Sequence, residues 1–183
     1  AAPQIETELR HGMSGSVLAQ VLRGDLDVGF HLDSGEDGAA ATTSPALSVR
    51  TLTRFTYRVV APAGWGPQVQ GRDWKALAAL PWLATPPESA HHRLLERVFA
   101  PLGLSPRRVA LVDQEASMLD LLKSGVGLSL VRDSIAIREC QAHGLAMADR
   151  VQLDCTLRFV SLASRRDEPV IASAWDALGK AWG

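Results

Sequence analysis

The sequence has few cysteines and no long apolar segment, and each absence excludes a class of protein. Two cysteines, Cys140 and Cys155, are too few for a secreted disulfide scaffold and do not have Cys-x-x-Cys spacing. No stretch approaches the roughly 20 apolar residues that span a bilayer, and the first residues show no basic-then-apolar signal segment. We therefore expect an ordinary soluble domain in a reducing, cytoplasmic compartment.

Charge of a single sign is also missing. The 19 basic and 20 acidic residues are intermixed and leave a formal net charge of −1. A domain that binds nucleic acid by itself usually carries a basic face. The densest basic pairs, Arg107-Arg108 and Arg165-Arg166, are typical of solvated strand edges. We expect that this chain alone does not bind DNA.

Catalytic and cofactor motifs are incomplete. Gly12 to Ser16 approaches the Gly-x-Ser-x-Gly nucleophile elbow, but Ser16 occupies the place of the second glycine. Gly125 and Gly127 follow a helical pattern and precede a strand, which is the reverse of a dinucleotide-binding loop and indicates a tight turn. No carboxylate pair or nucleophile triad is apparent. The sequence therefore predicts neither enzyme activity nor a cofactor.

Apolar periodicity divides the chain into alternating strands and helices. For example, Ile5 and Leu9 alternate with charged residues, as in a half-buried strand. Strands are expected near residues 4–10, 27–32, 47–53, 55–61, 82–84, 109–112, 128–131 and 156–163, and loops at 33–44 and 65–71. Helices are expected near 14–23, 73–80, 89–102, 116–124, 133–142 and 169–182, with Asp73, Ser89 and Asp133 as caps. The alternation predicts an α/β architecture with mostly parallel sheets.

Two helix–glycine–strand segments resemble a known family. The first is Ser14-Gly-Ser-Val-Leu-Ala-Gln-Val-Leu-Arg-Gly-Asp-Leu-Asp-Val-Gly-Phe30, and the second runs from Ala116 to Val131 through Ser124-Gly-Val-Gly-Leu128. They are similar to the effector-binding domain of LysR-type transcriptional regulators, in which a helix ending in Gly-(Asp/Glu)-Leu-Asp leads into a strand. In that family an (Ala/Ser)-Gly-x-Gly-(Ile/Leu) segment occurs in the second lobe. The resemblance covers nearly the whole chain.

The resemblance implies a two-lobed fold like that of type 2 periplasmic binding proteins, with the lobes joined by two crossing strands. Lobe I would comprise residues 1–60 and 157–183, and lobe II residues 61–156. The family also has a strand and a helix before the segment that matches Ala1 to Arg10, and an N-terminal winged helix-turn-helix. Neither is present in this sequence.

The function implied is that of a ligand-sensing regulatory domain. A small organic effector, for example a carboxylate, would bind between the lobes and control DNA binding by the helix-turn-helix, and the full-length protein would be a homo-oligomer. The alternative is a periplasmic-type solute-binding protein, which shares the fold class. Some members of the family sense oxidants through a cysteine pair, so Cys140 and Cys155 are either redox-active or small half-buried hydrophobes.

In lobe I the candidate effector-binding residues are Ser14, Phe30 and His31. Ser14 begins the first helix, where its hydroxyl is either a plain helix cap or a contact in the effector cleft, and the two roles are compatible. His31 follows Phe30 on a strand and is either a hydrogen-bonded core histidine or a ligand-binding one.

In lobe II the candidates are Thr85, Ser89, His91 and Glu115. The first three lie at a strand end and a helix start that face the cleft in the family, although a solvated first turn is the alternative for His91. Adjacent histidines diverge by about 100° on a helix, so His91 and its neighbour predict no metal site. Glu115 either helps to cap a helix or reaches into the crevice. Of all the candidates, only His31, His91 and Glu115 could carry charge.

Overall fold

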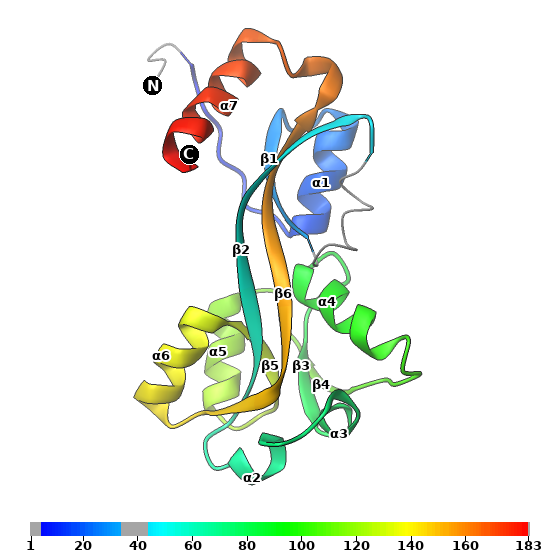
Figure 1. The fold of residues 1–183 in the computed structure, drawn as a ribbon, viewed down its shortest axis with the longest axis vertical. Coiled ribbons are helices and arrows are strands. Elements are labelled where there is room, and N and C mark those ends of the chain that lie inside the picture. The colour runs from blue at the N-terminus through cyan, green and yellow to red at the C-terminus, as the bar shows by residue number, and fades with distance from the viewer. Residues whose placement is uncertain (1–4, 34–43, 183) are drawn as a thin grey trace. The chain divides into compact units, whose positions relative to one another are not determined.

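The computed structural model describes residues 5–33 and 44–182, which form two compact α/β units (Figure 1). Unit 1 comprises Ala1–Arg54 and Thr156–Gly183, and unit 2 comprises Phe55–Cys155. The chain passes from one unit to the other within two long strands, β2 (Leu47–Ala61) and β6 (Ala146–Leu162). The expectation of two α/β units connected by two strands is thereby confirmed. The loop expected at 33–44 lies almost wholly outside the described residues.

The larger sheet has four strands in the order β1-β6-β2-β5. Strand β1 (Val28–Asp33) pairs antiparallel with β6, and β5 (Ser129–Arg132) pairs antiparallel with β2. The prediction of mostly parallel sheets is therefore wrong for this sheet. Alternating strands and helices predict parallel pairs only between strands that one helix connects, and β1 instead pairs with the last strand of the chain. Strands β3 (Pro81–Ala84) and β4 (Arg107–Leu111), which helix α4 connects, are parallel as expected.

In unit 1 the sheet is covered by a different helix on each face. Consecutive residues Val160 and Phe159 of β6 point to opposite faces. Val160 packs with Leu18 of α1 (Ser14–Arg23), and Phe159 packs with Trp175 of α7 (Pro169–Trp182). Burying each of these side chains stabilises the fold by about 1.5–3 kcal/mol, and both helices carry the apolar stripe that the sequence predicts. A short 3-10 turn, Ala163–Arg165, joins β6 to the segment before α7.

Unit 2 surrounds its core with short helices. The core gathers side chains from β2, β3, β5 and two helices, namely Val60, Leu83, Val131, Met118, Leu122 and Ala136. The helices are α2 (Gly66–Val69), α3 (Trp74–Ala78), α4 (Ala90–Phe99), α5 (Glu115–Lys123) and α6 (Asp133–His143). Helix α2 lies where the sequence predicted only a loop.

The Gly125-Val-Gly127 segment forms the tight turn expected from the sequence. Gly125 has φ 86°, a left-handed conformation that follows the end of α5. At Gly127 a Cβ atom would lie 2.6 Å from the carbonyl oxygen of Pro81. Glycine is therefore required here because the start of β5 approaches the backbone of β3 too closely for a side chain.

Two of the three expected helix caps are confirmed. The Asp73 side chain accepts a hydrogen bond from the Ala76 amide at 2.9 Å, and Ser89 accepts one from the His92 amide at 3.0 Å. The third prediction is wrong, because Asp133 is the first residue of α6 and its carboxylate instead accepts a 2.6 Å ion-paired bond from Arg58.

Other sequence-based boundaries also change. Residues 5–10 form no strand, and Leu9 is 87% exposed. Alternating residues give such a segment one apolar face, but a strand also needs a neighbouring strand to hydrogen-bond with. None of the described residues pairs with this segment. The stretches expected at 47–53 and 55–61 form the single strand β2, and the last strand begins at Ala146 rather than near residue 156.

Candidate functional site

In unit 1, Ser14 joins helix α1 to strand β1. Its hydroxyl accepts a hydrogen bond from the Leu32 amide at 2.7 Å and donates one to the Leu32 carbonyl at 3.1 Å. Met13 is the N-cap and Ser14 the first helical residue, so the helix-cap role expected for Ser14 is wrong. The hydroxyl bonds to the adjacent strand instead of the helix's own amides.

His31 completes this contact. Its Nδ1 lies 2.9 Å from both the hydroxyl and the carbonyl oxygen of Ser14. Because a carbonyl oxygen only accepts, the proton of this bond resides on Nδ1. Ser14 and His31 thus contact each other in a buried, hydrogen-bonded arrangement.

Phe30 lies on the opposite face of β1 from His31. Phe30 is 48% exposed and its ring centroid lies 5.3 Å from that of Phe159, whereas His31 is 2% exposed. Successive strand residues point to opposite faces, so Phe30 and His31 do not line one surface.

A buried ion pair that the sequence analysis missed lies beside His31. Arg158 on β6 is the register partner of His31, and its Nε lies 3.3 Å from the Asp33 carboxylate. Both side chains are largely buried. A buried pair of this kind is costly to desolvate and is retained only with close charge compensation. Sequence alone gave no signal for it, because the pair depends on strand register.

In unit 2, Thr85 and Ser89 are brought together as the sequence predicts. Their hydroxyl groups share a hydrogen bond, while Ser89 also caps α4. Thr85 follows β3 directly, so this bond fixes the end of the strand to the start of the helix.

His91, on the first turn of α4, is half-buried rather than on a solvated turn. Its ring packs edge-on against Tyr57 of β2 with the centroids 4.7 Å apart. Burial, together with a smaller effect of the positive charge of Arg132, lowers the pKa of His91 to about 4. The imidazole is therefore neutral near pH 7, so His91 does not supply the charge that the sequence analysis allowed it.

Arg132, which the sequence analysis missed, supplies a permanent charge next to His91. It ends β5 and is the register partner of Tyr57 on β2. Its guanidinium lies 4.4 Å from the centroid of the Phe55 ring. Burial raises the pKa of Tyr57 well above its usual range, while Arg132 acts in the opposite direction. We refer to Phe55, Tyr57, His91 and Arg132 as the Arg132 cluster.

Glu115 is exposed at the start of α5, where a negative charge suits the positive end of the helix dipole. Gln114 is the N-cap but its side chain makes no capping hydrogen bond, so the expected cap from residues 113–115 is wrong. The Glu115 charge contributes to raising the pKa of Tyr57, which places it within electrostatic reach of the Arg132 cluster.

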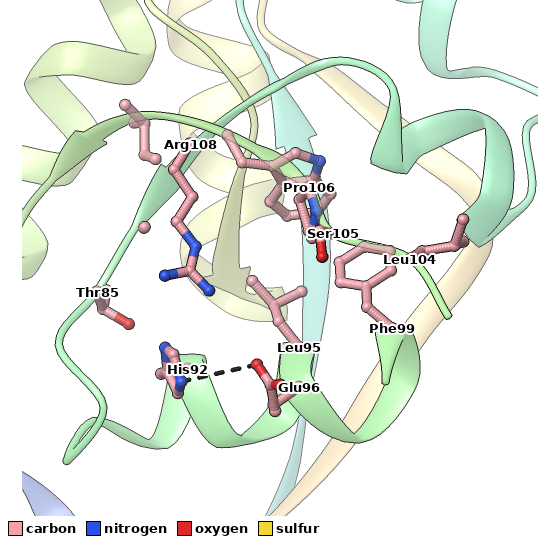
Figure 2. Close-up of a pocket in the computed structure, with 12 residues that line it drawn as sticks. Thr85, His92, Leu95, Glu96, Phe99, Leu104, Ser105, Pro106 and Arg108 are labelled. Carbon is pink, nitrogen blue, oxygen red and sulfur yellow. Dashed lines mark ion pairs between the residues drawn. The ribbon is translucent and has the colours of Figure 1, made fainter. Parts of the chain in front are cut away.

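A small pocket of about 70 Å³ lies between β3, α4 and β4 (Figure 2). Thr85, His92 and Arg108 line it, and the Arg108 side chain extends toward the other two. Glu96 lies 3.7 Å from His92 across one side. The pocket presents groups of both charge signs, and Thr85 is the single predicted site residue in its wall.

Neither a metal cluster nor a membrane-spanning helix is found in the described part of the chain. Residues 5–33 and 44–182 contain no group of three or more His, Cys, Asp or Glu side chains placed to hold a metal ion. Among the same residues, no helix has the length and apolar character needed to cross a bilayer.

Comparison with known proteins places the chain in a family. All of residues 1–183 match the sequence model of the LysR substrate binding domain. The chain belongs to this family, and its fold is the periplasmic-binding-protein-like α/β fold of LysR-type effector-binding domains. No curated protein sequence matches the chain significantly.

Solved structures agree at the level of the fold. The effector binding domain of QuiR in complex with shikimate is 15% identical, with a TM-score of 0.70 over 93% of this chain and 78% of that chain. The regulatory domain of CcmR from Synechocystis PCC6803 in complex with 2-PG is 13% identical, with a TM-score of 0.73 over 99% and 85%. Full-length CbnR complexed with its target DNA is 15% identical, with a TM-score of 0.64 over 94% of this chain and 59% of that chain.

Proposed function

We propose that this chain is the regulatory part of a LysR-type transcriptional regulator, in which a small organic effector controls DNA binding. The match of residues 1–183 to the LysR substrate binding domain carries this proposal. The effector would bind one arrangement of the domain more tightly than another and thereby shift the population of the DNA-binding state. An N-terminal helix-turn-helix of the full-length regulator would contact the DNA, since CbnR was solved with its target DNA and this chain spans 59% of it.

The effector-binding residues remain those predicted from the sequence, with one addition. We propose Ser14, His31, Thr85, Ser89, His91 and Glu115 as binding or positioning residues, and we add Arg132. Phe30 stays on this list as a residue exposed enough to touch a ligand. The division into lobe I (1–60 and 157–183) and lobe II (61–156) also remains a prediction.

The cellular setting follows from the same family. We propose a cytoplasmic protein that acts without catalysis and without a cofactor, and that self-associates in the full-length regulator. The comparisons give no support to the alternative of a periplasmic-type solute-binding protein.

A ligand screen coupled to a DNA readout tests the proposal. The 183-residue chain is screened by thermal denaturation against a library of small carboxylates, phosphate monoesters, amines and neutral metabolites. A compound that binds the native state raises the midpoint temperature, and the rise grows with the logarithm of its concentration above the Kd. The full-length protein is then tested with that compound in a DNA-binding assay. A stabilising compound that leaves DNA binding and transcription unchanged would contradict a regulatory role.

A further inference from the structure

Arg158 in unit 1 and Arg132 in unit 2 differ in their partners. In unit 1, Arg158 lies 3.3 Å from the carboxylate of Asp33, which compensates its charge. In unit 2, Arg132 makes no ion pair within 4.0 Å with any carboxylate of that unit's own residues, 55–155. Its chain neighbour Asp133 does not neutralise it, because that carboxylate is 2.6 Å from Arg58. Arg132, whose side chain is exposed, thus has no ion-pair partner within unit 2.

The Arg132 side chain is also held in place. Its guanidinium lies over the ring of Phe55, 4.4 Å from the centroid, in a cation–π contact. Phe55 in turn packs edge-on against Tyr57, with ring centroids 5.4 Å apart. Arg132 and Tyr57 are opposite each other in the β2–β5 ladder. A guanidinium oriented by its neighbours loses less conformational freedom when it forms paired hydrogen bonds.

The neighbouring side chains add polarity but no competing charge. His91 is neutral near pH 7 because burial lowers its pKa to about 4, and Tyr57 keeps its hydroxyl proton because burial raises its pKa. The negative charge of Glu115 also acts on Tyr57, and it is screened by solvent because Glu115, like Arg132, is exposed. The cluster accordingly offers one fixed cation beside aromatic rings.

We propose that Arg132 is the anion-binding residue of the effector site and that the effector is a small organic carboxylate with a flat, unsaturated body. The planar guanidinium forms two parallel hydrogen bonds to a carboxylate, and the half-buried ring of Phe55 provides apolar surface for the body, with the buried ring of Tyr57 behind it. This inference rests on the proposed function and names the chemical class of its ligand.

The test compares matched probes and matched variants of the 183-residue chain. The probes are benzoate, benzamide and benzylamine, which share a ring and differ in charge, together with the tightest-binding compound of the library. The variants are Arg132→Gln, which removes the charge, and Arg132→Lys, which keeps the charge but lacks the planar group that forms two parallel hydrogen bonds. Arg107→Gln is the control, because it removes an exposed arginine from β4 in the same unit. Calorimetry gives the affinities, and thermal denaturation without ligand shows whether each variant folds.

We expect carboxylates to bind and their amides to bind more weakly. Arg132→Gln should weaken carboxylate binding about tenfold or more, as expected for loss of a charge-assisted hydrogen bond. The affinity of Arg132→Lys for the carboxylate should lie between those of Arg132→Gln and the unaltered chain. Arg107→Gln should leave the affinity unchanged. A second variant, Phe55→Leu, keeps the charge but removes the ring beneath the guanidinium, and a moderate loss of affinity is expected.

Three results would overturn the inference. The first is a carboxylate that binds Arg132→Gln as tightly as the unaltered chain, and the second is a library in which phosphate esters, neutral compounds or amines bind best. The first removes the assignment of Arg132 and the second removes the carboxylate assignment, and both leave small-molecule sensing intact. The third is a library in which nothing binds, which removes the proposed function as well.

Discussion

His91 packs edge-on against Tyr57, with the ring centroids 4.7 Å apart and the ring planes at 81°. The contact joins the first turn of α4 to strand β2 and shields part of the imidazole from water. Burial disfavours the charged form, so the pKa of His91 falls from 6.5 to about 4. The helix start is thereby attached to the sheet by a side chain that must stay neutral.

Replacing His91 by Phe is expected to reduce the pH dependence of stability. As pH falls, the unfolded chain protonates this histidine near pH 6.5, whereas the folded chain does so near 4. The folded state binds fewer protons in this window, so the free energy of unfolding falls as pH decreases, by up to about 3 kcal/mol. Denaturant unfolding at a series of pH values measures the effect. An unchanged slope in His91→Phe would contradict the assignment.

Ser14→Ala should destabilise the chain through unit 1. The substitution leaves the Leu32 amide without its 2.7 Å acceptor and costs about 1–3 kcal/mol, as for other buried groups that lose a partner. Ser14→Gly should cost more than Ser14→Ala, because the position lies inside the helix and glycine lowers helix stability. If Ser14 were a helix cap, the order would be reversed. Ser16→Ala, on the same helix, serves as the control in chemical denaturation.

Gly127→Ala should destabilise unit 2 strongly. The new Cβ would lie 2.6 Å from the Pro81 carbonyl oxygen, and backbone atoms on both sides cannot move cheaply. We expect a loss of about 1–3 kcal/mol or more in thermal or denaturant unfolding. Gly66→Ala is the matched control, because its nearest neighbour is the end of the flexible Gln70 side chain at 3.6 Å. Equal stability of the two variants would show that β5 does not approach β3 as described.

The cysteines should be unreactive toward mild peroxide. Cys155 is buried, and burial together with the charge of Glu139 raises the pKa of the Cys140 thiol. Less thiolate means slower oxidation, since the thiolate is the reactive form. Mass spectrometry after peroxide treatment is expected to show both thiols reduced, with Cys140→Ser as the reference. A disulfide between them, accompanied by a changed ligand response, would establish the oxidant-sensing role instead.

The 183-residue chain should not retain duplex DNA in a sequence-specific manner. Its 19 basic residues are balanced by 20 acidic ones, and phosphate binding depends on an excess of positive charge. A gel-shift experiment at low salt, with the full-length regulator as the positive control, measures this. Specific retention by the chain alone would mean that one of its own faces reads DNA.

Local patterns predicted the elements well, because caps and stripes act over a few residues. Ser89 caps α4 as its position before an apolar stripe indicates, and Gly24 ends α1 in the left-handed conformation. The pairing of strands was predicted poorly. The antiparallel partner of β1 is β6, from the far end of the chain, and no local pattern encodes that register.

The candidate site likewise combines a contact that local spacing predicts with one that depends on strand pairing. Thr85 and Ser89 are four residues apart, and their contact follows from a strand end meeting a helix start. Arg132 and Tyr57 meet because β2 and β5 pair in one register, so the cluster could not be derived from spacing. The charged residue after a buried apolar strand at Leu128 to Val131 was the available signal for Arg132.

The way the chain is divided between its units sets the order in which they can be completed during synthesis. Unit 2 is one continuous segment, Phe55–Cys155, whereas unit 1 combines the first 54 residues with Thr156–Gly183. On the ribosome, unit 2 has its whole sequence available while the part of β6 that belongs to unit 1, residues 156–162, and helix α7 are still missing. Until those elements emerge, α1 and β1 have no partner for the residues that later contact Val160. Unit 1 is therefore the part of the nascent chain that most needs protection from aggregation.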